Sequence, residues 1–173
     1  MNRVVERSRE PLTEDDLRRL GAIARADREQ MFSRSRHWAP YRDRVLAVAL
    51  CQGGALHYLD GRTGVKDLDV WTFFAALHDR YPDRALYRRN KAYDYGPSPL
   101  GRHPDLPRYA GRKVDLLSDS IAVEPGADPG EAIRRWLRTE RRGNPANLGK
   151  KAVVLIEPVL GRVVWPELPP RSS

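Results

Sequence analysis

The sequence has 173 residues, of which 40% are hydrophobic and 31% are charged, and its 31 Lys and Arg against 23 Asp and Glu give a net charge of +8. This length is typical of one domain, and this hydrophobic content excludes a fully disordered chain. No apolar run reaches the roughly 20 residues of a membrane-spanning helix, and the N-terminal residues lack the apolar region of a signal peptide. The single Cys51 excludes an internal disulfide and a cysteine-based zinc cluster. We therefore expect a cytoplasmic protein with no membrane contact.

Arginine accounts for 26 of the 31 basic residues. One explanation is codon usage in a GC-rich genome. The other is a polyanionic partner, either a nucleoside triphosphate or a nucleic acid, because the planar guanidinium donates two parallel hydrogen bonds to a phosphate. The two explanations are compatible, and composition does not choose between them.

In the first part of the chain, residues 1–12 are polar without periodicity and are predicted to form a flexible N-terminal arm. Thr13 is a typical N-cap, and apolar residues at helical spacing predict a helix over 14–32. The uninterrupted apolar run at 45–50 is typical of a strand buried on both faces. A short helix is expected over 55–60.

Alternation of polar and apolar residues then predicts a strand over 66–73, followed by a helix over 74–81. Residues 83–111 are rich in Arg, Tyr, Pro and Gly and are predicted to be irregular. A third strand is expected over 113–117.

Near the C-terminus, Asp128 and Pro129 indicate the start of a helix that continues through Leu137. Residues 146–156 have helical spacing, although their Val-Val-Leu-Ile end equally suits a strand. A short strand at 163–165 and a tail at 166–173 complete the chain. We expect an α/β or α+β fold, in which a small mixed β-sheet has helices packed on it, in one domain spanning 13–165.

The segment Leu50-Cys51-Gln52-Gly53-Gly54-Ala55 joins a predicted strand to a predicted helix through a glycine turn. The first N–H groups of a helix have no partners within the helix, and together with the helix dipole they bind phosphate. Glycine lets the backbone approach an anion closely. The turn is therefore a candidate phosphate-binding site.

Asp67 and Asp69 lie two residues apart on one face of the next predicted strand. Two carboxylates this close repel each other unless a cation lies between them, and oxygen ligands favour Mg²⁺. Asp115 lies in an apolar strand, where an unpaired carboxylate is costly, so we expect it to have a partner or a metal. A phosphate-binding turn beside such acids is the minimum needed for metal-assisted phosphoryl or nucleotidyl transfer.

Taken together, Gly53-Gly54, Asp67-Leu68-Asp69-Val70 and Val114-Asp115-Leu116 resemble the signature of the nucleotidyltransferase (DNA polymerase β-like) superfamily. That signature is a Gly followed by Gly or Ser, a spacer, an acid-apolar-acid-apolar strand, and a third acid on a later strand. The resemblance covers about residues 43–117 and points to a small single-domain member.

The resemblance implies transfer of a nucleoside monophosphate from an NTP to an acceptor hydroxyl, with release of pyrophosphate. Asp67 and Asp69 would bind Mg²⁺, and Asp115 would complete the metal site and help to deprotonate the acceptor. Gly53 and Gly54 would hold the triphosphate. Many members carry Ser at the second glycine position and direct its hydroxyl at the phosphates.

Each part of this pattern also has a simpler interpretation. Gly53-Gly54 suits an ordinary tight turn. Asp67 and Asp69 suit an exposed strand face paired with Arg, and Asp115 suits a salt bridge to a neighbouring Arg or Lys. The alternative function is therefore a non-catalytic nucleotide- or RNA-binding or regulatory module on the same fold, which Gly54 in place of Ser favours.

Residues 83–111 combine Arg with Tyr, a composition that binds phosphates and stacks on bases. If this stretch forms a wall of the site, Arg88 and Arg89 would contact the phosphates of an NTP or RNA, and Tyr93 or Tyr95 would stack on a base. The alternative is a solvated loop whose Tyr side chains pack locally. A second basic cluster on the helix that follows Asp128 is interpreted as a solvated face.

The four His residues show no ligand spacing, and no nucleophilic triad is evident. We interpret His57 as a structural or surface residue and Cys51 as a small buried one.

Overall fold

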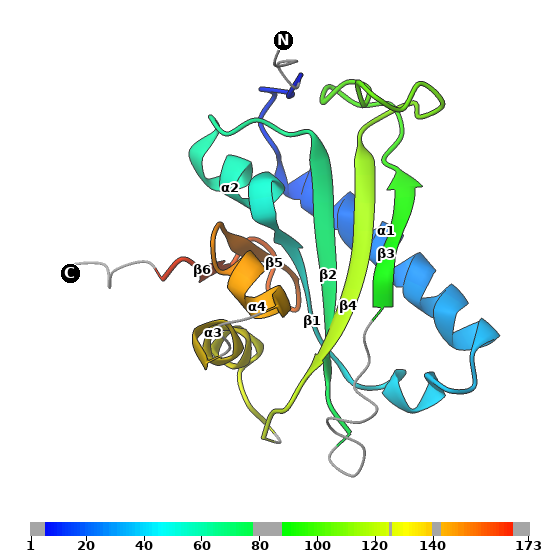
Figure 1. Ribbon diagram of the computed structural model, residues 1–173, viewed down its shortest axis with the longest axis vertical. Coiled ribbons are helices and arrows are strands. Elements are labelled where there is room, and N and C mark those ends of the chain that lie inside the picture. Colours follow the sequence, from blue (N-terminus) through cyan, green and yellow to red (C-terminus); the bar gives the residue numbers. More distant parts are fainter. Residues whose placement is uncertain (1–5, 78–87, 125, 140–142, 168–173) are drawn as a thin grey trace.

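The computed structural model describes residues 6–77, 88–124, 126–139 and 143–167, with the backbone alone for residues 88–90 and 139 (Figure 1). Within this part of the chain, six strands form one sheet in the order β3-β4-β2-β1-β5-β6. The strands are β1 (Val45–Cys51), β2 (Asp67–Ala75), β3 (Arg88–Asp94), β4 (Lys113–Ile121), β5 (Val153–Glu157) and β6 (Val163–Trp165). The helices are α1 (Glu14–Arg34), α2 (Gln52–Asp60), α3 (Pro129–Thr139) and α4 (Gly143–Leu148), with a 3-10 turn at Ala39–Tyr41.

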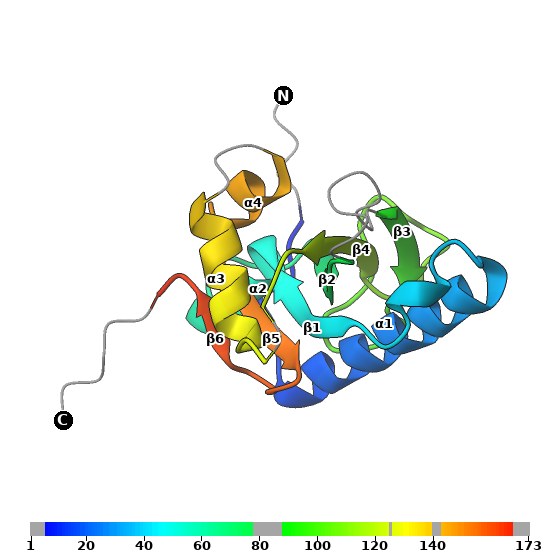
Figure 2. The same ribbon diagram turned by 90° about the horizontal axis from the view of Figure 1, so that it is seen from below.

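The sheet is mixed, because β2 and β4 are parallel while the other neighbouring strands are antiparallel. Helix α1 packs on one face of the sheet, and α3 and α4 pack on the other (Figures 1 and 2). Leu17 and Leu20 of α1 contribute to the core on the first face, and Ile133 and Leu137 of α3 contribute to the core on the second. This architecture confirms the expected mixed sheet with packed helices.

The expected helix over 74–81 is wrong where the structure describes it, because β2 continues to Ala75. Phe74 is fully buried and makes edge-on contacts with the rings of Phe32 and Tyr41, so tertiary packing holds it in a strand. Residues 78–81 lie outside the described residues.

The structure corrects or extends the sequence prediction for three strands. Strand β3 lies inside the expected irregular stretch and pairs with β4 at one edge of the sheet. Helix α4 ends at Leu148, and the Val-Val-Leu-Ile segment forms β5, so the strand interpretation of that segment is confirmed. The third expected strand extends to Ile121.

Residues 6–12 are held against the body of the protein, in contrast to the flexible arm expected over 1–12. Ser8 and Val65 exchange two backbone hydrogen bonds of 2.8 and 2.9 Å. His57 lies behind this segment: its Nδ1 accepts from the N–H of Gly64 (2.9 Å), so its Nε2 donates to the carbonyl of Glu10 (2.8 Å). His57 is therefore structural, as expected. Residues 1–5 lie outside the described part.

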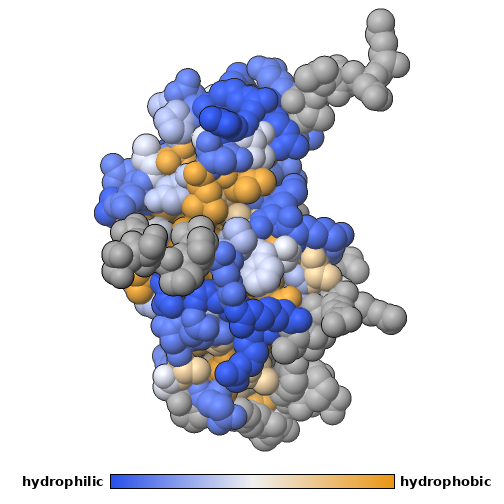
Figure 3. Space-filling view, turned by 90° about the vertical axis from the view of Figure 1, so that its left-hand side faces the viewer, coloured by the Kyte–Doolittle hydropathy of each residue, from blue (hydrophilic) through white to orange (hydrophobic). Residues whose placement is uncertain are grey.

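Among the described residues, none of the helices is both long enough and apolar enough to span a bilayer. Viewed from the side of α2, α3 and β6, apolar surface forms separate patches divided by hydrophilic surface (Figure 3). Leu59 and Val159 are large apolar side chains that remain exposed, at 38% and 51%.

Asp128 caps α3 as the sequence predicted, and it also pairs with Arg162. Its Oδ1 accepts from the N–H of Glu131 (2.9 Å), and its carboxylate binds both terminal nitrogens of Arg162 at 2.8 and 2.9 Å. The hydrogen bond from Arg162 is the main reason that the pKa of Asp128 falls to about 2.

We expect Asp128→Ala to lower the free energy of unfolding by about 1 kcal/mol at pH 7, since both the cap and a partly exposed ion pair are lost. A depressed pKa in the folded state stabilises the protein above pH 4, and this contribution disappears as the pH falls toward 2. Urea unfolding of the variant and the wild type should therefore converge in acid. Asp128→Asn, which keeps the capping oxygen, should lose less at pH 7; an equal loss would contradict the capping role.

Candidate active site

The central feature of the candidate site is the parallel register of β2 and β4, which places Asp69 directly opposite Asp115. Neighbouring strands lie about 4.8 Å apart, so these two side chains are adjacent on one face of the sheet. Asp67 lies two residues earlier in β2, on the same face and opposite Lys113. Burial, followed by the charges of Asp115 and Asp67, raises the pKa of Asp69 to about 6. The three acids therefore form one electrostatically coupled group near the starts of β2 and β4, which lie at the upper end of the sheet in Figure 1.

Asp115 is buried, and its two carboxylate oxygens have different surroundings. Its Oδ2 lies 3.0 Å from the Nζ of Lys113, whose pKa is raised by this hydrogen bond and by the Asp115 charge despite partial burial. Its Oδ1 is buried without a hydrogen-bond partner in the structure. The expected salt bridge to a neighbouring Lys is therefore present, and one carboxylate oxygen is left over. A buried oxygen without a partner is costly, which makes it a natural ligand for a cation.

Asp67 contacts a histidine that the sequence did not single out. The Nε2 of His103 donates to Oδ1 of Asp67 over 2.8 Å, and His103 is 6% exposed. Its Nδ1 accepts from the N–H of Asp105 (3.1 Å), so the ring proton lies on Nε2. The sequence contained no spacing that linked His103 to Asp67, because the two residues meet only when a long loop folds back.

The glycine turn leads into α2, whose first N–H, that of Gln52, donates to the carbonyl of Ala152 over 3.0 Å. Cys51 precedes α2 without a capping side-chain hydrogen bond, and it is fully buried as expected. Gln52 has a φ of 60°, the left-handed region that non-glycine residues rarely adopt and that clusters at functional sites. Gly53 lines a cleft of about 230 Å³ together with Asp67 and Asp69.

Three cations line the same cleft, and they come from three distant segments: Arg7, Lys66 and Lys151. A side chain at position 53 would project toward two of them, since its Cβ would lie 3.8 Å from a nitrogen of Arg7 and 3.9 Å from Nζ of Lys151. The cleft therefore brings positive charge and the start of α2 beside two carboxylates. Sequence reasoning identified neither Arg7 nor Lys151.

Gly54 occupies a different environment from Gly53. A Cβ at position 54 would point into the core, 3.2 Å from a methyl of Leu50 and 3.4 Å from a methyl of Leu68. A Ser at this position in this chain would place its Cβ toward the core and away from the cleft. The absence of a hydroxyl at position 54 therefore reflects packing.

Within the described residues, no group of three or more His, Cys, Asp or Glu side chains is arranged to hold a metal ion. Mg²⁺ commonly takes one or two protein carboxylates and completes its coordination with water and substrate phosphates. Asp67 and Asp69 fit that smaller ligand set, because both carboxylates line the cleft and are hard oxygen donors on one face of β2.

The Arg/Tyr stretch does not supply the stacking residues that the sequence suggested. Tyr95 is 2% exposed, and Tyr93 donates to Asp27 of α1 (2.8 Å) on the opposite face from the acids. Both are therefore structural. Arg102 and Arg112 donate to backbone carbonyls, while the side chains of Arg88 and Arg89 lie outside the described residues.

The basic cluster on α3 is largely engaged within the protein. Arg134 contacts Glu131 and the carbonyls of β6, and Arg138 pairs with Glu167. Arg141 and Arg142 lie outside the described residues.

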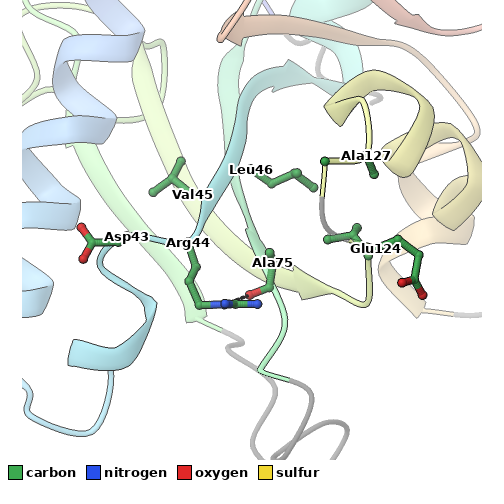
Figure 4. Close-up of a pocket in the computed structure, with 9 residues that line it drawn as sticks. Asp43, Arg44, Val45, Leu46, Ala75, Glu124 and Ala127 are labelled. Atoms are coloured by element: carbon green, nitrogen blue, oxygen red, sulfur yellow. Dashed lines mark hydrogen bonds between the residues drawn. The ribbon is translucent and has the colours of Figure 1, made fainter.

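A second cavity of about 330 Å³ lies at the opposite end of the sheet, where β1 begins and β2 ends (Figure 4). Its guanidinium, from Arg44, donates to the carbonyl oxygens of Ala75 (2.9 Å) and Ala76 (2.7 Å). Those hydrogen bonds give Arg44 a structural role, so the cleft beside the acids is the better candidate for a functional site.

Comparison with known proteins gave no match to a family model, a curated protein or a solved structure.

The first prediction from this geometry concerns Gly54. We expect Gly54→Ser to be less stable than Gly54→Ala by about 1–3 kcal/mol, because the serine buries a hydroxyl against Leu50 and Leu68. Gly53→Ser should cost less, since the nearest atoms to its Cβ are long, flexible basic side chains. Urea unfolding of the three variants measures the difference. Equal stability of Gly54→Ser and Gly54→Ala would show that position 54 reaches the cleft.

The second prediction concerns Asp69. A carboxyl with a raised pKa in the folded state contributes stability that is present below pH 4 and is lost as the pH rises through about 6. Asp69→Asn removes this cost, so the variant should be about 2–3 kcal/mol more stable than the wild type at pH 7 and equally stable below pH 4. Urea unfolding at both pH values tests this. A destabilised variant at pH 7 would contradict the electrostatic coupling of the acids.

Proposed function

We propose that this protein is a Mg²⁺-dependent nucleotidyltransferase that moves a nucleoside monophosphate from an NTP to an acceptor hydroxyl and releases pyrophosphate. The observation that carries the proposal is the adjacency of Asp69 and Asp115 beside a cleft that also holds the start of α2. The sequence resemblance to the nucleotidyltransferase superfamily supports the same assignment. We also propose that the protein is cytoplasmic. Its substrate would be an NTP, and RNA or another polyanion is a candidate acceptor.

In this proposal the basic residues of the cleft bind the triphosphate, and the acidic residues bind the metal. Arg7, Lys66 and Lys151 would attract the triphosphate, and the N–H groups that follow Gln52 at the start of α2 would donate to a phosphate oxygen. Asp67 and Asp69 would hold the metal, and Asp115 lies beside them on β4. When bound, Mg²⁺ stabilises the negative charge that develops on the transferred phosphate and the leaving group.

The transfer itself is an in-line displacement. The oxygen of the acceptor hydroxyl bonds to the α-phosphorus of the NTP, and the bond from that phosphorus to the oxygen bridging to the β-phosphate breaks. Pyrophosphate leaves with the bonding electron pair. Asp115 takes the hydroxyl proton, a role supported by its unpartnered Oδ1.

The non-catalytic alternative remains the second candidate function, and Gly54 in place of Ser favours it less than the sequence suggested. Gly54 in place of Ser favoured a binding module, but position 54 points toward Leu50 and Leu68 and not toward the cleft. The three acids that catalysis requires lie together on one face.

To test catalysis, the protein is incubated with α-labelled NTPs and Mg²⁺ in the presence of RNAs, proteins and small hydroxylated molecules. We expect label transfer with at least one acceptor, and a loss of more than about 100-fold for Asp69→Asn and Asp115→Asn. Asp119→Asn is the matched control, because Asp119 lies on the same face of β4 but binds Asn144 away from the cleft. Binding of NTP without transfer to any acceptor would favour the non-catalytic alternative.

The basic wall of the cleft, which consists of Arg7, Lys66 and Lys151, gives a separate prediction. Lys151→Met should raise KM for the NTP by about tenfold with a smaller change in kcat, because a charge contact to phosphate is lost in the ground state and the transition state alike. Lys150→Met is the control, since Lys150 is its neighbour in the chain but does not line the cleft. Equal effects of the two substitutions would indicate general electrostatic attraction.

A further inference from the structure

His103 is fixed on both of its ring nitrogens. Nδ1 accepts the N–H of Asp105, and Nε2 donates to Oδ1 of Asp67. The backbone N–H of His103 donates to the carbonyl of Gly111 over 3.0 Å. The side chain is 5% exposed, so water offers little competition for these bonds. The imidazole therefore has one orientation and one tautomer in this structure.

The loop that carries His103 is closed at its base. The N–H of Tyr95 donates to the carbonyl of Arg112 (2.9 Å). The carboxylate of Asp94 accepts from three backbone N–H groups, those of Gly96, Ala110 and Gly111. These bonds tie the two ends of the loop together and to the sheet.

The two ends of the loop also touch where no side chain fits. A Cβ at Gly111 would lie 1.9 Å from the carbonyl oxygen of Gly96, so the backbones are in direct contact there. The carbonyl of Gly111 also accepts the backbone N–H of His103, so the residue at this contact is bonded directly to the residue that carries the imidazole.

A second tie joins the same loop to the same end of β2. The Nζ of Lys66 lies 3.0 Å from Oδ2 of Asp105. Lys66 and Asp67 are consecutive residues, and each is held by a residue of the loop. The loop therefore contacts the start of β2 through two consecutive residues, Lys66 and Asp67.

We propose that His103 is a positioning residue for Asp67: by occupying Oδ1 it directs the remaining oxygen of that carboxylate toward the metal, an inference that rests on the proposed function. Among the described residues, Oδ2 of Asp67 receives no hydrogen bond, which leaves it for the cation. Partners that hydrogen-bond the ligands of a metal orient those ligands, and their loss typically weakens metal binding by 10- to 100-fold.

Two substitutions separate the two hydrogen bonds of the ring. In His103→Gln the side-chain amide nitrogen takes the place of Nε2 and can still donate to Asp67. In His103→Asn the side-chain oxygen takes the place of Nδ1 and can still accept from Asp105, but nothing reaches Asp67. A merely structural role would be served by either variant.

The measurement is Mn²⁺ binding without nucleotide, followed through the free-ion electron paramagnetic resonance signal, with thermal unfolding to confirm folding. We expect the Kd of His103→Asn to rise by about 10- to 100-fold and that of His103→Gln to stay within a few-fold of the wild type. His57→Asn is the matched control, because His57 is a buried histidine with the same bonding pattern but donates to a backbone carbonyl. Its Mn²⁺ affinity should be unchanged. Asp69→Asn should abolish binding.

The outcomes distinguish this inference from the proposed function. If Asp69→Asn abolishes binding but His103→Asn binds like the wild type, the positioning role is wrong and the proposed function stands. If the wild type binds no Mn²⁺, both fall. If His103→Asn does not fold, the wild type provides the test by nuclear magnetic resonance: Mg²⁺ should shift the Nε2–H proton signal of His103 and leave that of His57 in place. A shift of neither signal would overturn the positioning role.

Discussion

The parallel pairing of β2 with β4 forces two carboxylates, Asp69 and Asp115, into adjacent positions on a largely buried face. Like charges at this separation and burial disfavour ionisation, which is why the pKa of Asp69 rises. The surroundings of the acids are arranged to offset that repulsion. Lys113 neutralises one oxygen of Asp115, and Lys151 lowers the electrostatic cost at Asp69.

The acids could be predicted from the sequence because their positions follow from local rules. Alternation fixed which face of the strand Asp67 and Asp69 share, and an isolated carboxyl among apolar neighbours marked Asp115. What the pattern could not supply was the register between the two strands. That register depends on the whole sheet, and it is what converts three separate acids into one group.

Other features were out of reach because they depend on contacts between distant segments. His103, Arg7 and Lys151 reach the cleft from a loop and from segments far apart in the chain, and none has a local signature. Strand β3 was missed because an edge strand of sequence Arg-Arg-Asn-Lys-Ala-Tyr-Asp carries little hydrophobic alternation. Tyr95 illustrates the opposite error: its composition suggested base stacking, whereas its hydroxyl binds Asp16 of α1 and its ring lies beneath the guanidinium of Arg19.

The pinning of residues 6–12 against the turn before β2 has a consequence for the order in which the protein assembles. Arg7 reaches the cleft through this early segment, whereas Lys151 stands just ahead of β5. During synthesis the two cations emerge from the ribosome far apart in time, and the sheet between them must form before they face each other. A nascent chain that has not yet extended beyond α4 thus has its acids but lacks part of the basic wall. The set of cations that lines the cleft is accordingly complete only in the finished molecule, at the last stage of folding.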